Sequence, residues 1–170
     1  MKTRLLGRLS AVAMITLTGF AGVASPRDRH ADSFRATVSG AVGVTISGKA
    51  TFGRVAGGPD VFTLSLGTDS SEGAVLFTLA NDNRLSVGSY KVSDTGPGRR
   101  VIQGLIMLGR SDRPEGVFRV QSGTLTVTSA SDHALTGLFS LDAAGFLASS
   151  PERENRLVYV SGSFTAHAAD

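Results

Sequence analysis

The sequence predicts an all-β fold, a single antiparallel β-barrel or β-sandwich of about 8–10 short strands behind an N-terminal leader. From Phe34 to Phe52 apolar and polar residues alternate with a period of two, which is typical of half-buried β-structure. Short apolar runs then recur at roughly 10-residue spacing, separated by Gly, Pro, Asn and Asp. No run after the leader has the apolar spacing of an amphipathic helix.

The N-terminal residues have the pattern of a secretory signal peptide, which we expect to be helical. Lys2, Arg4 and Arg8 precede an uncharged, mainly apolar run, and Gly22 and Ala24 fit the −3 and −1 positions of a cleavage site. The alternative is an uncleaved membrane anchor, but the run is shorter than the ~20 residues of a spanning helix. The sequence therefore predicts an exported protein, periplasmic or extracellular, with no integral membrane span after cleavage.

The leader divides the chain into three parts and changes its charge. We expect residues 1–24 to be the signal peptide, residues 25–33 a disordered mature N-terminus, and residues 34–170 a single all-β domain.

The whole chain has a net charge of +3, from 17 basic and 14 acidic residues, and three of the basic residues lie in the leader. The mature chain is therefore neutral and predicts no nucleic-acid partner. The absence of Cys excludes disulfides and thiol chemistry.

The strands are expected in the following order. Residues 34–52 form either one long bent strand or two strands joined by an odd-length turn, because a two-residue hairpin would invert the alternation. The other expected strands are apolar runs between turn residues, at 61–67, 74–80, 89–93, 100–109, 117–121, 124–129, 134–141 and 156–168. Ser122-Gly123 is interpreted as a turn, and residues 142–155 as the one irregular connection, in which Ser150 and Pro151 are typical of a short helical turn.

The rival to a barrel or sandwich outside the membrane is a membrane-spanning β-barrel. A membrane-spanning barrel needs aromatic girdles at both interfaces, whereas the chain has two Tyr, no Trp and a polar C-terminus.

Within the domain, Gly40, Gly48, Gly137 and Gly162 share the apolar face of their strands. A glycine inside a strand lowers stability by about 0.5–1 kcal/mol relative to alanine. We expect them to curve the sheet and to be covered by Phe rings of neighbouring strands. The alternative is that they open space for an interior ligand.

No residues form a recognisable catalytic, cofactor or metal constellation. His30, His133 and His167 are scattered and lack metal-ligand spacing. Ser131, Asp132 and His133 are consecutive, whereas triad members converge in space, so this run is interpreted as a turn. The run "GPGRRV" lacks the third glycine of a dinucleotide loop and leads into a strand. We therefore assign no catalytic, cofactor-binding or metal residues.

Four arginines bracket one expected strand and form either an anion-binding rim or a solvated face. They are Arg99 and Arg100 before the strand and Arg110 and Arg113 after it. The solvated face is the simpler interpretation, because charged side chains in turns are normally exposed.

The segments "LSVGSYKV", "SGTLTVTSASDHALTGLFSL" and "LVYVSGSFTAH" resemble a pattern of small exported bacterial all-β proteins, which are often lipoproteins. The resemblance covers mainly the C-terminal half, at Leu85 to Tyr90, Ser122 to Thr128, Thr136 to Leu141 and Val160 to Ala166. The chain departs from that group because it lacks the Cys that carries the lipid. The resemblance implies the fold and supplies no site.

These observations predict a non-enzymatic, exported β-domain that acts as a binding or envelope-associated module for a protein or small-molecule partner. The alternative is a lipocalin-like carrier that holds a small apolar ligand in the barrel interior. A hydrolase or isomerase is a third hypothesis, and it would need polar side chains on the inward positions, of which the sequence shows almost none.

Overall fold

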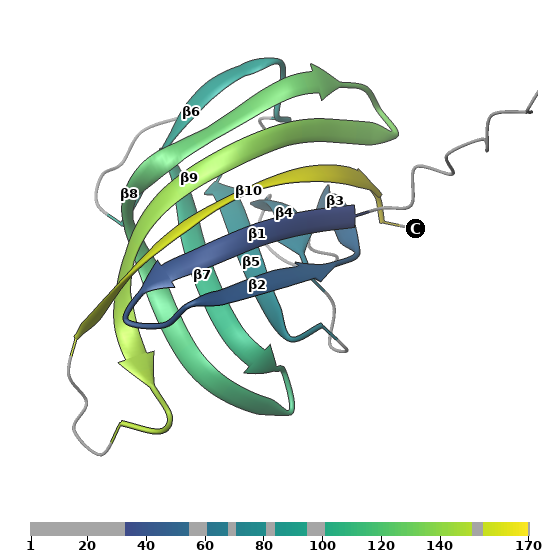
Figure 1. Ribbon diagram of the computed structural model, residues 1–170. Helices are drawn as coiled ribbons and strands as arrows, with labels where there is room; N and C mark the ends of the chain where they lie inside the picture. The colour runs from purple at the N-terminus through teal and green to yellow at the C-terminus, as the bar shows by residue number, and fades with distance from the viewer. Residues whose placement is uncertain are drawn as a thin grey trace, which may run out of the picture.

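The computed structural model describes residues 33–54, 61–67, 71–80, 84–94, 101–150 and 155–169, and these form ten strands in one sheet (Figure 1). The strands are β1 (Ser33–Gly40), β2 (Val44–Gly48), β3 (Ala50–Arg54), β4 (Val61–Leu66), β5 (Gly73–Ala80), β6 (Gly88–Ser93), β7 (Val101–Arg110), β8 (Arg113–Ala130), β9 (Ala134–Leu147) and β10 (Arg156–Ala168). The all-β prediction is confirmed. The expected signal peptide, most of the expected disordered segment and Pro151 lie outside the described residues.

The strand pairings follow a path that returns to its starting strand. The sheet order is β2-β1-β10-β3-β4-β5-β7-β6-β8-β9, and β10 also pairs with β9 while β7 also pairs with β8. The path from β10 through β3, β4, β5, β7, β8 and β9 therefore leads back to β10. Within the described residues the pairings are antiparallel except β3–β10 and β6–β7, which are parallel and short. Figure 1 shows the sheet curling around a common interior.

Two long strands each serve two partners on one side. The first half of β8 pairs with β7 and its second half with β6. In the same way β10 pairs first with β1, over Val158 to Thr165, and then with β3 at His167 and Ala168. Along one edge, each long strand therefore pairs with two shorter strands in succession.

The prediction of a turn at Ser122-Gly123 was wrong, because β8 continues through both residues. The register with β9 shifts between Val120 and Ser122, which leaves Gln121 as the extra residue of a β-bulge. A bulge adds one residue to one strand and so inverts the alternation without reversing the chain. This bulge causes the change of parity that was interpreted as a turn.

The irregular connection was predicted to begin too early. β9 continues past Asp142 to Leu147, paired with β8 on one side and β10 on the other. Ala143, Ala144 and Gly145 give a weak strand signal. They are nevertheless in strand conformation because each has a paired neighbour on both sides.

Residues 34–52 form three strands, β1, β2 and the beginning of β3, where either one bent strand or two strands joined by an odd-length turn were predicted. The odd-length turn is present between the first two strands. Three residues, Ala41 to Gly43, separate β1 from β2, so the connection has odd length and both strands keep the same inward parity. Gly40 was predicted to face inward between apolar neighbours, and this was wrong. It is exposed, with a φ of 102° at the end of β1, so it supplies the left-handed conformation of a turn.

Phe rings cover two of the three remaining glycines. Phe34 on β1 lies opposite Gly48 on β2, and its Cε1 is 3.4 Å from the position of a Cβ on that glycine. Phe164 on β10 lies opposite Gly137 on β9, with its Cζ 2.8 Å from the equivalent position. A Cβ on Gly48 would also meet the Ser71 hydroxyl, and one on Gly137 the Thr126 carbonyl oxygen. At Gly162 the neighbours are the backbone and a Cβ of β1, with no ring among them. The predicted covering is confirmed at the first two positions, and close strand approach accounts for the third.

The inward side chains form one continuous hydrophobic core. Its largest fully buried members come from seven strands and are Phe77, Phe118, Ile46, Leu64, Leu66, Ile102, Ile106, Leu125, Leu135, Leu141, Val38 and Val75. Phe77 and Phe139 meet edge to face, with ring centroids 5.6 Å apart. The part of the chain that is described contains no helix of the length and apolarity needed to cross a membrane.

Candidate functional site

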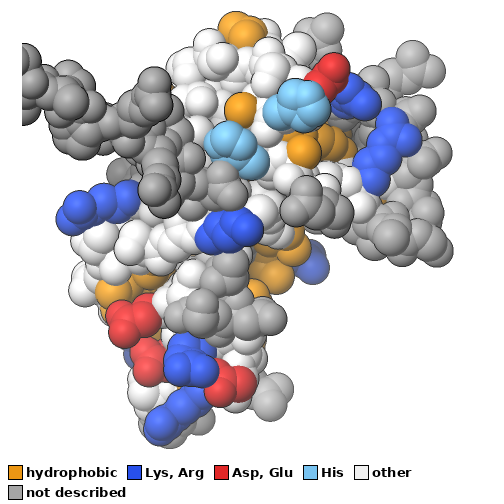
Figure 2. All heavy atoms as spheres, turned by 90° about the vertical axis from the view of Figure 1, so that its right-hand side faces the viewer, with side chains coloured by type: hydrophobic (Ala, Val, Ile, Leu, Met, Phe, Trp, Pro, Cys, Tyr) orange, Lys and Arg blue, Asp and Glu red, His pale blue; other side chains and the backbone are white. Residues whose placement is uncertain are grey.

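The candidate site is a cavity of about 220 Å³ at one end of the sheet, here called the end pocket. At this end β3, β10 and the β8–β9 turn come together with the segment that precedes β6. Its lining consists of apolar side chains with charged and polar groups at the edge: Phe52, Gly53, Arg54, Phe62, Arg84, Leu85, Ser131, Asp132, Leu135, Ala168 and Ala169. Figure 2 views this end and shows hydrophobic side chains among charged ones.

The floor of the end pocket is aromatic and aliphatic. The rings of Phe52 on β3 and Phe62 on β4 are stacked, with centroids 5.8 Å apart and an angle of 30° between their planes. Leu85 and Leu135 complete the floor and are only 5% and 2% exposed. Phe52 and Phe62 come from the paired strands β3 and β4, whereas Leu135 lies on β9 and Leu85 in the segment before β6.

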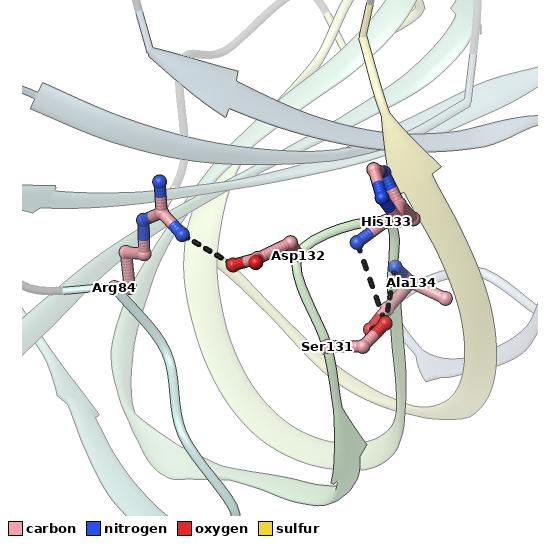
Figure 3. Close-up of polar contacts among 5 residues, drawn as sticks. All are labelled: Arg84, Ser131, Asp132, His133 and Ala134. Carbon is pink, nitrogen blue, oxygen red and sulfur yellow. Dashed lines mark hydrogen bonds and ion pairs between the residues drawn. The ribbon is translucent and has the colours of Figure 1, made fainter.

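The edge carries an ion pair between Arg84 and Asp132 (Figure 3). Arg84 Nη1 lies 2.5 Å from Asp132 Oδ1, and the two side chains are 72% and 76% exposed. Arg54, at the end of β3, adds a second guanidinium to the lining. Among the lining residues that the structure describes, the charged ones are Arg54, Arg84 and Asp132, and they lie around an apolar floor.

The β8–β9 turn places Asp132 at this edge. Ser131 Oγ accepts hydrogen bonds from the backbone N–H groups of His133, at 3.3 Å, and Ala134, at 3.0 Å. The Ser131 N–H donates to the Ala134 carbonyl at 2.8 Å. Figure 3 shows Asp132 directed from this turn toward Arg84. The interpretation of these three consecutive residues as a turn is confirmed, because the serine hydroxyl closes the turn and the carboxylate pairs with Arg84.

A tyrosine fixes the segment that supplies Arg84 and Leu85. The Tyr90 hydroxyl donates to the Ser86 carbonyl at 2.8 Å and accepts the Ser86 N–H at 2.8 Å. Both contacts span four residues, so they tie the segment before β6 to the strand itself. Arg84 at the edge and Leu85 in the floor are consecutive and are held by this one anchor.

Two histidines that look scattered in the sequence lie at the same end. The Ala168 N–H donates to the His133 carbonyl at 3.2 Å, and His167 pairs with Ala134 in the register of β9 and β10. The described residues contain no group of three His, Asp or Glu side chains that could hold a metal ion.

The bracketing arginines do not come together at the end pocket. Arg110 and Arg113 face each other in the β7–β8 hairpin, and Arg110 Nε lies 3.1 Å from Asp112 Oδ1. This hairpin is at the far end of β7 from Val101, the residue that follows Arg100. Arg99 and Arg100 lie outside the described residues.

Two further cavities have other positions. One of about 280 Å³ lies against β5, β7 and β8, with Thr78, Gln103 and Arg119 in its lining. One of about 170 Å³ lies near the β7–β8 hairpin, at the opposite end from the end pocket, and is lined mostly by small residues. Neither combines an aromatic floor with a charged edge, which is why the end pocket is the candidate site.

Comparison with known proteins adds no relative. No known protein family, no curated protein and no solved structure matches this chain.

Proposed function

We propose that the chain is an exported, non-enzymatic β-domain that acts as a binding or envelope-associated module, with the end pocket as its binding site. One observation carries the proposal: stacked Phe52 and Phe62 form an apolar floor beneath an exposed Arg84–Asp132 pair. A concave apolar surface with a few convergent polar groups is typical of small-molecule sites. The closed path of strand pairings supports a single β-barrel as the scaffold.

The size of the end pocket limits what it can hold. Pockets for drug-sized ligands measure about 300–1,000 Å³, whereas a cavity of about 150 Å³ accommodates benzene. At about 220 Å³ the end pocket suits a single ring or a short branched chain, free or attached to a larger partner.

The lipocalin-like carrier receives less support than this arrangement. Its ligand would occupy the barrel interior, where the described inward side chains form a continuous core. The inward glycines at Gly48 and Gly137 are covered by Phe34 and Phe164 instead of opening space. The proposal therefore places the ligand at the end of the barrel.

A fragment screen by ligand-observed NMR tests the binding proposal on the mature chain, residues 25–170. We expect small aromatic fragments to bind wild type and to lose binding in Leu85→Phe, because the larger ring occupies the pocket. Leu138→Phe adds the same atoms at a position that is 51% exposed outside the pocket, and should bind as wild type. Fragments that bind all three proteins equally would overturn the assignment of the site.

Two further measurements test the remaining parts of the proposal. Expression with the leader in a bacterial host should yield a chain that begins at Ser25 in the periplasm or medium, as N-terminal sequencing would show. Retention of an uncleaved chain in the membrane would contradict export with cleavage. Turnover of an ester, glycoside or peptide substrate that a point mutation abolishes would contradict a non-enzymatic role.

A further inference from the structure

We propose that the end pocket selects small zwitterions with a single aromatic ring, the chemical class of the aromatic α-amino acids. In the complex Arg84 holds the carboxylate of the ligand, and Asp132 holds its ammonium group. This inference rests on the proposed function of the end pocket as a binding site. It adds the class of the ligand and gives each member of the ion pair a partner of its own.

The ion pair between Arg84 and Asp132 opens at little cost. The two side chains are 72% and 76% exposed, and such a pair contributes little to stability because water solvates each charge. The backbones of the two residues are held separately. The Tyr90 hydroxyl holds the segment of Arg84 at Ser86, and the Ser131 hydroxyl closes the turn of Asp132. Opening the pair therefore needs rotation of two side chains and no movement of a strand.

A ligand with a single charge disturbs the balance of this pair. A carboxylate that binds Arg84 leaves Asp132 beside a second negative charge, and an ammonium group that binds Asp132 leaves Arg84 beside a second positive charge. Each single-charge ligand therefore forms one contact by breaking another, and it adds a repulsion. Arg54, the other charged residue of the described lining, already has an interaction partner, so the ion pair supplies the charges for a ligand.

A zwitterion satisfies both members of the pair. Its carboxylate binds Arg84 and its ammonium group binds Asp132, so the four charges alternate in sign. Two contacts replace one, and the net charge at the pocket edge stays unchanged. In an α-amino acid both charged groups are attached to one carbon atom. The charged groups of the pair are likewise adjacent, with Arg84 Nη1 2.5 Å from Asp132 Oδ1.

The floor of the pocket determines the apolar half of the ligand. Phe52 and Phe62 are stacked at the base, and a further ring packs on such rings by offset or edge contacts. A cavity of about 150 Å³ accommodates benzene, so about 220 Å³ leaves room for one ring with a short substituent. Leu85 in the floor follows Arg84 at the edge directly. The spacer between the ring and the charged groups is therefore short, as it is in phenylalanine.

Four probes with the same ring and spacer test this selection by chemical-shift titration of the mature chain at low salt. Phenylalanine has both charges, 3-phenylpropionate only the carboxylate, phenethylamine only the ammonium group, and ethylbenzene neither. We expect phenylalanine to bind about fivefold more tightly than either single-charge probe, because an exposed ionic contact contributes up to about this factor. A peptide that begins or ends with an aromatic residue offers one charge beside the ring, so the single-charge probes also represent that source.

Each member of the ion pair should account for one charge of the ligand. Arg84→Gln should remove the preference for phenylalanine over phenethylamine, and Asp132→Asn should remove its preference over 3-phenylpropionate. The exchange variant, Arg84→Asp with Asp132→Arg, should restore the preference for the zwitterion. The matched control is Arg110→Gln with Asp112→Asn, which removes an exposed ion pair of the β7–β8 hairpin and should leave all four affinities unchanged.

The outcomes separate the inference from the proposed function. A preference for phenylalanine that survives in the combined Arg84→Gln and Asp132→Asn variant would overturn the inference, as would its absence from a folded exchange variant. Equal affinity of wild type for all four probes, lost in Leu85→Phe, would overturn the selection of zwitterions while the pocket remains a binding site. Failure of all four probes and of the fragment screen would overturn both.

Discussion

Replacing Gly137 by alanine should destabilise the domain, although alanine is normally the better residue in a strand. Gly137 is buried on β9, where a Cβ would contact the Thr126 carbonyl oxygen and would lie 2.8 Å from Phe164 Cζ. The carbonyl belongs to the backbone of β8 and is fixed by the strand pairing. The contact therefore cannot be relieved by rotation of a side chain, and the strands must move apart.

The size of the effect follows from two opposing contributions. Exchange of Gly for Ala at an unstrained site stabilises a protein by about 0.4–1 kcal/mol, because it reduces the entropy of the unfolded chain. Forcing an extra methyl group into a packed core costs about 1–3 kcal/mol. We expect a net loss of about 1–2 kcal/mol in the free energy of unfolding, and a fall of about 3–10 °C in Tm for a domain of this size.

Urea denaturation followed by circular dichroism measures this loss, and two other glycines provide controls. At Gly43 no atom lies within 4 Å of an added Cβ, so Gly43→Ala should gain about 0.5 kcal/mol. At Gly48 the close neighbour is the Ser71 hydroxyl, the end of a side chain, so Gly48→Ala should lose less than Gly137→Ala. A Gly137→Ala protein as stable as wild type would refute the explanation of the inward glycines.

Two other substitutions test the core and the anchor of the end pocket. Phe118→Ala removes a side chain that is fully buried, and should lower the free energy of unfolding by about 3–5 kcal/mol in the same denaturation assay. Tyr90→Phe removes the hydroxyl that holds Ser86, and should cost about 0.5–1.5 kcal/mol. It should also increase amide hydrogen exchange at Ser86, and unchanged exchange there would contradict the role of Tyr90 as an anchor.

Most of the strands could be predicted because each has one buried face. The alternation from Phe34 onward places Phe34, Ala36 and Val38 on the same side, and the structure buries all three. The runs at β5 and β7 are apolar on both faces, and each has a paired strand on both sides. Local periodicity determines which residues face inward, and this information is present in single segments of sequence.

The errors occur where pairing with distant strands overrides the local pattern. At Gln121 a bulge inverts the parity of β8, and the local sequence cannot distinguish this from a turn. At Ala143 and Ala144 small residues form a strand because β8 and β10 both pair with them. In each case the conformation depends on pairing with a neighbouring strand, which the local sequence does not reveal.

No residue of the end pocket could be assigned from the sequence, because its members are recognisable only by their position together. Phe52, Phe62 and Leu135 look like ordinary core residues, and Asp132 looks like a turn residue. The sheet brings them to one end, where Arg84 meets Asp132 across 48 positions of the chain.

The inward glycines also bear on where the pocket lies. Phe164 over Gly137 and Phe34 over Gly48 occupy space that a ligand in the interior would need. The interior side chains thereby contribute to stability, whereas the end pocket lies where strands terminate and side chains can meet solvent. The glycine substitutions should consequently change the free energy of unfolding with little effect on the affinity of the small aromatic fragments that bind the end pocket. A Gly48→Ala protein that remains folded yet loses affinity for these fragments would show that the core and the pocket are coupled, contrary to this division.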